Sequence, residues 1–102
     1  LIDLGTRMLR RTGVAEREAR QALLPLVEQT VAGYARLGTR AWTGPLERGD
    51  ADTVRRHLKA LRRLPPVYRR VYAALAEAGI ELYRRDRGQT TRALRRVLKK
   101  VR

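Results

Sequence analysis

The sequence has no cysteine, no phenylalanine, a single tryptophan and a single histidine, His57. Without cysteine the chain forms no disulfide and has no thiol nucleophile, a composition that fits a reducing cytoplasm. One histidine and ten scattered carboxylates do not make the ligand set of a closed zinc site, so we expect no metal centre. No apolar run approaches the roughly 18 residues that a membrane-spanning helix needs. We therefore predict a cytoplasmic protein without a transmembrane segment.

Positive charge is abundant and unevenly distributed, with a formal net charge of +14. Residues 1–50 carry 8 basic and 6 acidic side chains, whereas residues 51–102 carry 16 basic and 4 acidic ones. Such a field attracts phosphates in nucleic acid, anionic lipid or a phosphorylated cofactor. Arginine dominates, since the only lysines are Lys59, Lys99 and Lys100. Because GC-rich coding also produces this bias, a charged partner and a coding effect both remain open explanations.

Apolar residues recur at spacings of three and four, which is typical of amphipathic helices, and no segment shows strand alternation. We predict an all-α fold, a bundle of about five helices. In the fourth of these, Val67, Val71, Leu75 and Leu82 are expected to face inward. The predicted helices cover residues 1–11, 15–37, 51–64 and 66–84, with a fifth that Thr90 or Thr91 could cap.

The segment TGPLERGDADTVRRHL, residues 43–58, contains the candidate binding residues. Gly44 begins a predicted turn, and Asp50 is a predicted helix cap, because its carboxylate can accept from the free N–H groups that follow. Arg48 carries a guanidinium fork that suits a carboxylate or phosphate. The turn residues Thr43 and Gly44, with Arg48, Asp50 and Thr53, are the predicted substrate-binding set.

His57 is the candidate catalytic residue, because histidine exchanges protons near neutral pH. Asp50, Thr53 and His57 are spaced i, i+3 and i+7, which places them on one face of a helix. The ordinary alternatives are a solvated Arg48, a purely capping Asp50, and a His57 packed beside the apolar face that Leu58 belongs to. Spacing alone leaves the catalytic and the structural roles open.

Three stretches of the chain resemble a known family. They are ALLPLVEQTVAGYARLG (residues 22–38), AWTGPLERGDADTVRRHLKAL (41–61) and PPVYRRVYAALAEAGIELYRR (65–85). Together they are similar to domain-of-unknown-function family 2520, a helical C-terminal domain that follows a Rossmann-like domain in predicted oxidoreductases. These proteins look like relatives of pyrroline-5-carboxylate reductase and of the 6-phosphogluconate dehydrogenase C-terminal-domain class. The resemblance covers residues 1–84, while the basic helical tail, residues 85–102, has no counterpart in it.

The resemblance implies a function in two parts. An N-terminal Rossmann-like domain would bind NAD or NADP, and this helical domain would form a homodimer and close over a small-molecule substrate. Because the sequence has no Gly-rich nucleotide fingerprint, we expect the nucleotide-binding half to lie outside these residues and this chain alone to be inactive. The first helix is then expected to be the end of a longer one, and Arg48 and His57 to face the cleft.

A second class of function follows from charge alone. The basic second half could bind nucleic acid or another protein through a helix that carries cations opposite an apolar stripe. Its low aromatic content and the lack of a helix-turn-helix signature count against nucleic acid. The same tail could also lie on an acidic partner or an anionic membrane surface.

Overall fold

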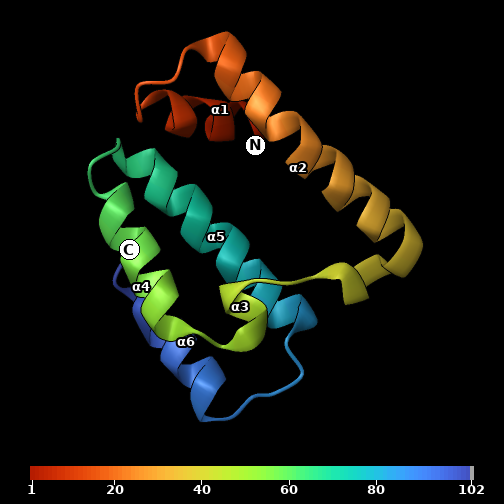
Figure 1. The fold of residues 1–102 in the computed structure, drawn as a ribbon. Helices are drawn as coiled ribbons and strands as arrows, with labels where there is room; N and C mark the ends of the chain where they lie inside the picture. Colours follow the sequence, from red (N-terminus) through yellow and green to blue (C-terminus); the bar gives the residue numbers. More distant parts are fainter. Residues whose placement is uncertain (102) are drawn as a thin grey trace. The chain divides into compact units, whose positions relative to one another are not determined.

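The computed structural model describes residues 1–101, which contain five α-helices of nine residues or more and no strand (Figure 1). The predicted all-α class with about five helices is therefore confirmed. None of these helices combines the length and the apolar content required to cross a bilayer. The elements are α1 (Ile2–Arg10), α2 (Glu16–Leu37), the 3-10 helix η1 (Gly38–Ala41), α3 (Pro45–Arg48), α4 (Ala51–Leu61), α5 (Pro66–Tyr83) and α6 (Gln89–Lys99).

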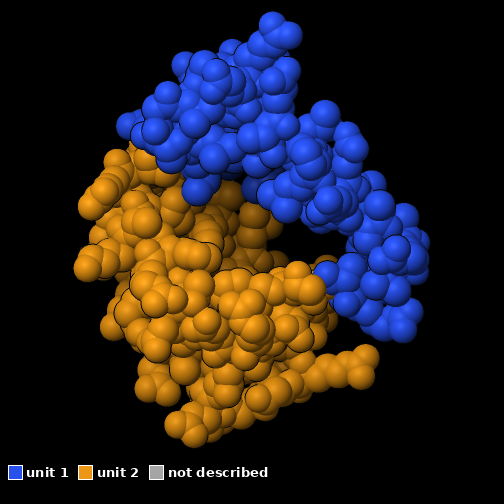
Figure 2. Space-filling model, in the orientation of Figure 1, with its two compact units in different colours: residues 1–41 blue, residues 42–102 orange. Residues whose placement is uncertain are grey.

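The chain divides into two compact units, Leu1–Ala41 and Trp42–Arg102, which Figure 2 colours separately. In the first unit α1 packs against α2. Gly5 makes this approach close, because a Cβ added there would come within 3.3 Å of a methyl group of Leu23. Gly38 ends α2 with a positive φ of 61°, a conformation that glycine adopts without steric cost.

The apolar stripe of α2 continues well beyond the part that packs against α1. Ala19, near its beginning, is fully buried. Val31 and Tyr34, three and four turns further on, remain 63% and 64% exposed, and Leu26 is exposed to a similar degree. Most of α2 therefore presents apolar side chains to the surroundings.

In the second unit α4, α5 and α6 surround one hydrophobic core (Figure 1). Each helix supplies small or aliphatic side chains at helical spacing, so that the three axes approach closely. Pro66 begins α5 at a position where its missing N–H is not needed. The buried members of the core are Val54 and Leu58 from α4, Ala73, Ala76 and Ile80 from α5, and Leu94, Val97 and Leu98 from α6.

The prediction for the inward face of α5 was wrong. Val67, Leu75 and Leu82 are 43%, 52% and 69% exposed, and Val71 is half-buried. The helix has apolar residues on two opposite faces, and the face with the smaller side chains, which includes Ala76, packs into the core. The larger side chains of the other face had favoured that face as the buried one, but three closely packed helices accommodate alanine better at their contact.

The start of α6 also differs from the prediction, because neither Thr90 nor Thr91 caps it. The helix begins at Gln89, after Gly88, and Thr91 instead lies buried in its first turn. Its hydroxyl donates to the carbonyl oxygen of Asp86. A domain boundary at residue 84 stays a prediction; within the structure α6 completes the core of the second unit.

Candidate functional site

The candidate site is built on the turn between α3 and α4. Gly49 ends α3 in the left-handed region, with φ 75° and ψ 27°. Any Cβ at this position would overlap Thr90 Cγ2 and lie 3.4 Å from the Arg84 guanidinium. Glycine is therefore required both by the backbone conformation and by the close approach of the first turn of α6. The turn directs the chain into α4 at Asp50.

Asp50 caps α4, as predicted. Its Oδ1 accepts from the Thr53 N–H at 3.1 Å, and its Oδ2 accepts from the Thr53 hydroxyl at 2.6 Å. The Arg48 guanidinium lies 3.5 Å from Oδ2. Hydrogen bonds from the Thr53 hydroxyl and amide, and then the charge of Arg48, hold the pKa of the Asp50 carboxyl below its usual value. Asp50 is thus an ionised capping group with both oxygens engaged.

Arg84 fixes the other side of this turn. Its side chain is only 8% exposed, and its Nη1 donates to the carbonyl oxygens of Leu46 and Glu47 at 2.7 and 2.9 Å. Its Nε donates to the Thr91 hydroxyl at 2.8 Å. The two carbonyls lie in α3, and the carbonyl of Leu46 also accepts from the Gly49 N–H at 3.3 Å. A helix of one turn leaves most of its carbonyl oxygens available to partners outside it. One guanidinium therefore joins α3, the end of α5 and the start of α6.

His57 lies on the second turn of α4 and is paired with Tyr72 of α5. Its Nδ1 is 2.9 Å from the Tyr72 hydroxyl, and the two rings meet edge to face at 5.9 Å between centroids. His57 is exposed, so it is not enclosed among the aliphatic side chains of α4. Burial raises the pKa of the half-buried Tyr72 phenol, which stays protonated at neutral pH. The phenol can then donate to Nδ1, which leaves the proton of a neutral imidazole on Nε2.

The structure brings only part of the predicted set into direct contact. Arg48, Asp50 and Thr53 form one connected group, which Arg56 extends by donating to the Thr53 hydroxyl at 2.9 Å. The hydrogen-bond partner of His57 is Tyr72 rather than a member of that group. The other two members precede α3: Thr43 is exposed, and Gly44 adopts a positive φ of 109° as the N-cap residue.

Sequence reasoning missed two residues that organise this region, Tyr72 and Arg84. Tyr72 is 15 positions from His57, and Arg84 is 37 and 38 positions from the carbonyls that it binds. No local pattern links such distant residues. The one signal available for Arg84 was a cation directly after the last turn of a helix, which is a common surface arrangement.

No metal centre emerges from residues 1–101, since no three histidine or acidic side chains gather there in a group that could hold an ion. None of the chain's glycines forms a nucleotide fingerprint either. What the region can offer a ligand is an exposed imidazole, supported by a phenol, and the exposed guanidinium of Arg48. These groups suit an anion and a proton transfer.

Comparison with known proteins identifies a family for this chain. The model of the family described as "Domain of unknown function (DUF2520)" matches residues 1–79. No curated protein and no solved structure matches the chain. The match includes α1 to α4, the whole α3–α4 turn and most of α5, and it ends before α6. Since it covers more than half of the sequence, this chain belongs to the DUF2520 family.

Proposed function

We propose that this chain is the helical substrate-side and dimerisation domain of an oxidoreductase that uses NAD or NADP. A Rossmann-like partner domain would bind the nucleotide, and hydride chemistry would belong to that cofactor. Family membership supports the proposal, because the resemblance described above places such domains after a Rossmann-like one. The observation that carries it is the exposed His57 with its imidazole hydrogen-bonded to Tyr72.

His57 would act as the proton donor to the substrate. In its protonated form His57 would donate from Nδ1 to the Tyr72 hydroxyl oxygen, which holds the ring in one orientation and directs the Nε2 proton outward. Transfer of that proton to the substrate would leave a neutral imidazole, as general acid catalysis requires. Tyr72 is then a positioning residue, since it acts through the imidazole. Protonation of a reduced product at a nearby atom accompanies many hydride transfers, and a helical domain that covers the substrate would also exclude water.

Arg48 would bind an anionic group of the substrate or cofactor. Its guanidinium is 58% exposed in spite of its contact with Asp50, so donors remain available for a carboxylate or phosphate. Asp50 and Thr53 would hold the turn in place, because their polar atoms already bond to each other. Thr43 and Gly44 would line the approach. A cytoplasmic location remains a prediction from composition.

The catalytic assignment is tested in the full-length enzyme with its nucleotide-binding domain. A His57→Gln variant keeps a polar side chain but cannot donate a proton, so turnover should fall about 100-fold, measured by NAD(P)H absorbance. Arg63→Gln changes an exposed cation two residues after the end of α4, and as the matched control it should change turnover less than twofold. A loss of less than about threefold for His57→Gln would leave the residue with a packing role only.

The dinucleotide part of the proposal has an independent test. The residues encoded immediately upstream should contain a strand, a G-x-G-x-x-G turn and a helix. NADPH added to the full-length protein should change the fluorescence of Trp42, the single tryptophan of this chain, if the nucleotide-binding domain closes over this unit. An unrelated upstream neighbour without nucleotide binding would remove the oxidoreductase assignment.

Homodimer formation would explain the exposed apolar faces of α2 and α5. Val31 and Tyr34 on α2 and Leu75 and Leu82 on α5 are each more than half exposed. Burial of such side chains contributes roughly 25 cal/mol for each Å² of apolar surface removed from water. Val31→Glu combined with Leu75→Glu should therefore reduce the mass measured by light scattering to that of a monomer.

The control for the dimer test is Gln21→Glu combined with Gln29→Glu. These glutamines are exposed residues of α2 that lie outside its apolar stripe, so the dimer should persist in this variant. A wild-type chain that is monomeric at micromolar concentration, or a dimer that survives both pairs of changes, would contradict the assignment of these faces.

A further inference from the structure

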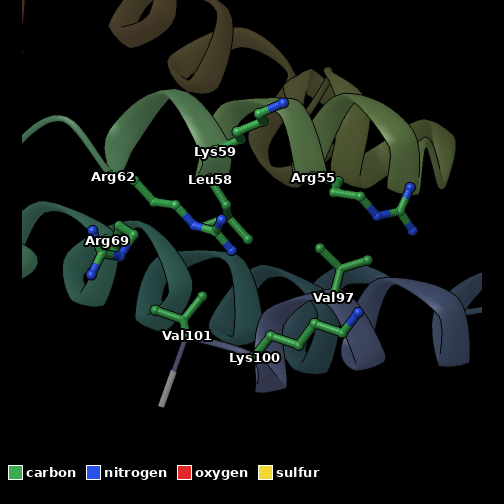
Figure 3. A pocket seen from close by; sticks show the side chains of 8 residues that line it. All are labelled: Arg55, Leu58, Lys59, Arg62, Arg69, Val97, Lys100 and Val101. Atoms are coloured by element: carbon green, nitrogen blue, oxygen red, sulfur yellow. The ribbon is translucent and has the colours of Figure 1, made fainter.

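A recess of about 320 Å³ opens between α4, α5 and α6 of the second unit, away from the α3–α4 turn (Figure 3). Leu58 from α4 faces Val97 and Val101 across it, so that its floor is apolar. Cationic side chains from all three helices surround this floor, and no carboxylate is among the lining residues. The cations are Arg55 and Lys59 from α4, Arg62 directly after α4, Arg69 from α5 and Lys100 directly after α6.

Most of these cations have no counter-charge within residues 1–101. Arg55 contacts the exposed carboxylate of Asp52 on its own helix. The side chains of Lys59, Arg62, Arg69 and Lys100 make no hydrogen bond or ion pair with a described residue. Like charges gathered at one place repel each other and destabilise the folded chain. An anion bound between them would remove that repulsion.

We propose that this recess binds an organic phosphate that carries at least two negative charges and has a flat or apolar part. The guanidinium groups of Arg62 and Arg69 can each donate two parallel hydrogen bonds to phosphate oxygens. The apolar floor receives the rest of the ligand, and the volume lies at the lower end of the 300–1,000 Å³ typical of small-molecule sites. No aromatic side chain lines the recess for base stacking, which favours a compact ligand over a nucleic-acid strand.

This phosphate site is separate from the His57 region, although both use α4. Successive helical residues are rotated by about 100° around the axis. Leu58, Lys59 and Arg62 therefore share one flank of α4, whereas Thr53 and His57 lie on the opposite flank. The inference rests on the recess alone and is independent of any role of His57.

Isothermal titration of the full chain with ADP and with inorganic pyrophosphate tests the proposal. Both compounds should bind, and ADP should bind more tightly, because only ADP has a base that can contact the apolar floor. Arg62→Gln combined with Arg69→Gln should weaken ADP binding at least tenfold, since each arginine contributes charge-assisted hydrogen bonds. The unliganded variant should unfold at an equal or higher temperature than the wild type, because repulsion is reduced and neither side chain has a protein partner.

Arg85→Gln combined with Arg96→Gln is the matched control. These residues are not part of the recess, and the variant has the same net charge as the pocket variant. It should change ADP affinity less than threefold. Equal losses in the two variants would mean that net charge alone attracts the nucleotide, and would overturn the site. A single-stranded oligonucleotide that binds more tightly than ADP and responds equally to both variants would assign the charge to nucleic acid instead.

Discussion

Nδ1 of His57 and the hydroxyl oxygen of Tyr72 are 2.9 Å apart, and the two residues belong to different helices of the second unit. The contact joins the exposed side of α4 to α5 above the hydrophobic core. A histidine in such a pair has a fixed ring orientation, which an isolated surface histidine lacks. A fixed orientation distinguishes a positioned proton donor from a solvated side chain. Replacing Tyr72 by phenylalanine, which removes only the hydroxyl oxygen, tests this role.

Tyr72→Phe should reduce the turnover of the full-length enzyme by about tenfold, because the imidazole loses the partner that orients it. The decisive measurement is the double variant with His57→Gln. If Tyr72 acts only through His57, the double variant should be no slower than His57→Gln alone. Losses that multiply would instead show that the two residues contribute independently.

Arg84→Met should destabilise the chain by about 2–4 kcal/mol, since the guanidinium makes three short hydrogen bonds from a nearly buried position. Methionine keeps the apolar length of the side chain, but it removes the hydrogen bonds that Arg84 donates to two carbonyl oxygens of α3. Urea unfolding followed by circular dichroism measures the change. Arg85→Met alters the neighbouring exposed arginine and should stay within about 0.5 kcal/mol of the wild type.

Gly49→Ala should cost about 1–3 kcal/mol, because a Cβ is strained at φ 75° and also overlaps Thr90 Cγ2. Gly13→Ala separates the two causes, since Gly13 has φ 98° with nothing within 4 Å of an added Cβ. Thr90→Ser removes the overlapping methyl group and should recover part of the Gly49→Ala loss. If no recovery is measured in the double variant, backbone strain alone accounts for the effect.

Leu94→Ala should cost about 2–5 kcal/mol, because Leu94 is fully buried in the core that α6 shares with α4 and α5. Leu1→Ala is the matched control, since Leu1 is 79% exposed and the same atoms are removed there. Unfolding of the purified chain in urea compares the two. Similar small losses would mean that α6 is not an integral part of the second unit.

The free energy of unfolding should depend on pH through the carboxyl group of Asp50. Its pKa is lower in the folded chain than the ordinary value of about 3.9, so its contribution is complete above that value. The contribution is lost as the pH falls through the depressed folded pKa. Asp50→Asn should therefore show a smaller loss of stability than the wild type between pH 6 and pH 2. Thr53→Val should show an intermediate loss of stability over this pH range, because the hydrogen bond from the backbone N–H of residue 53 to the carboxylate remains.

Local chemistry made most of the helices predictable, whereas contacts between helices were not. Asp50 was predicted as a cap, and the second helix was predicted to end at residue 37, because each depends only on adjacent backbone. The inward face of α5 was mispredicted because both of its faces carry apolar residues, and only the partner helices decide which is buried. The roles of Tyr72 and Arg84 depend on contacts across 15 and 38 positions, which periodicity does not encode.

All three lysines of the chain, Lys59, Lys99 and Lys100, lie in the second unit, so lysine modification reports on that unit alone. Residues 1–41 contain no lysine, and two of the three lysines in the chain, Lys59 and Lys100, border the phosphate recess. Amine-reactive reagents will therefore modify lysine ammonium groups in the second unit alone. Mass spectrometry after acetylation can compare the extent of modification of Lys59 and Lys100 with and without a ligand in the recess. Lys99, which does not line the recess, serves as the internal reference.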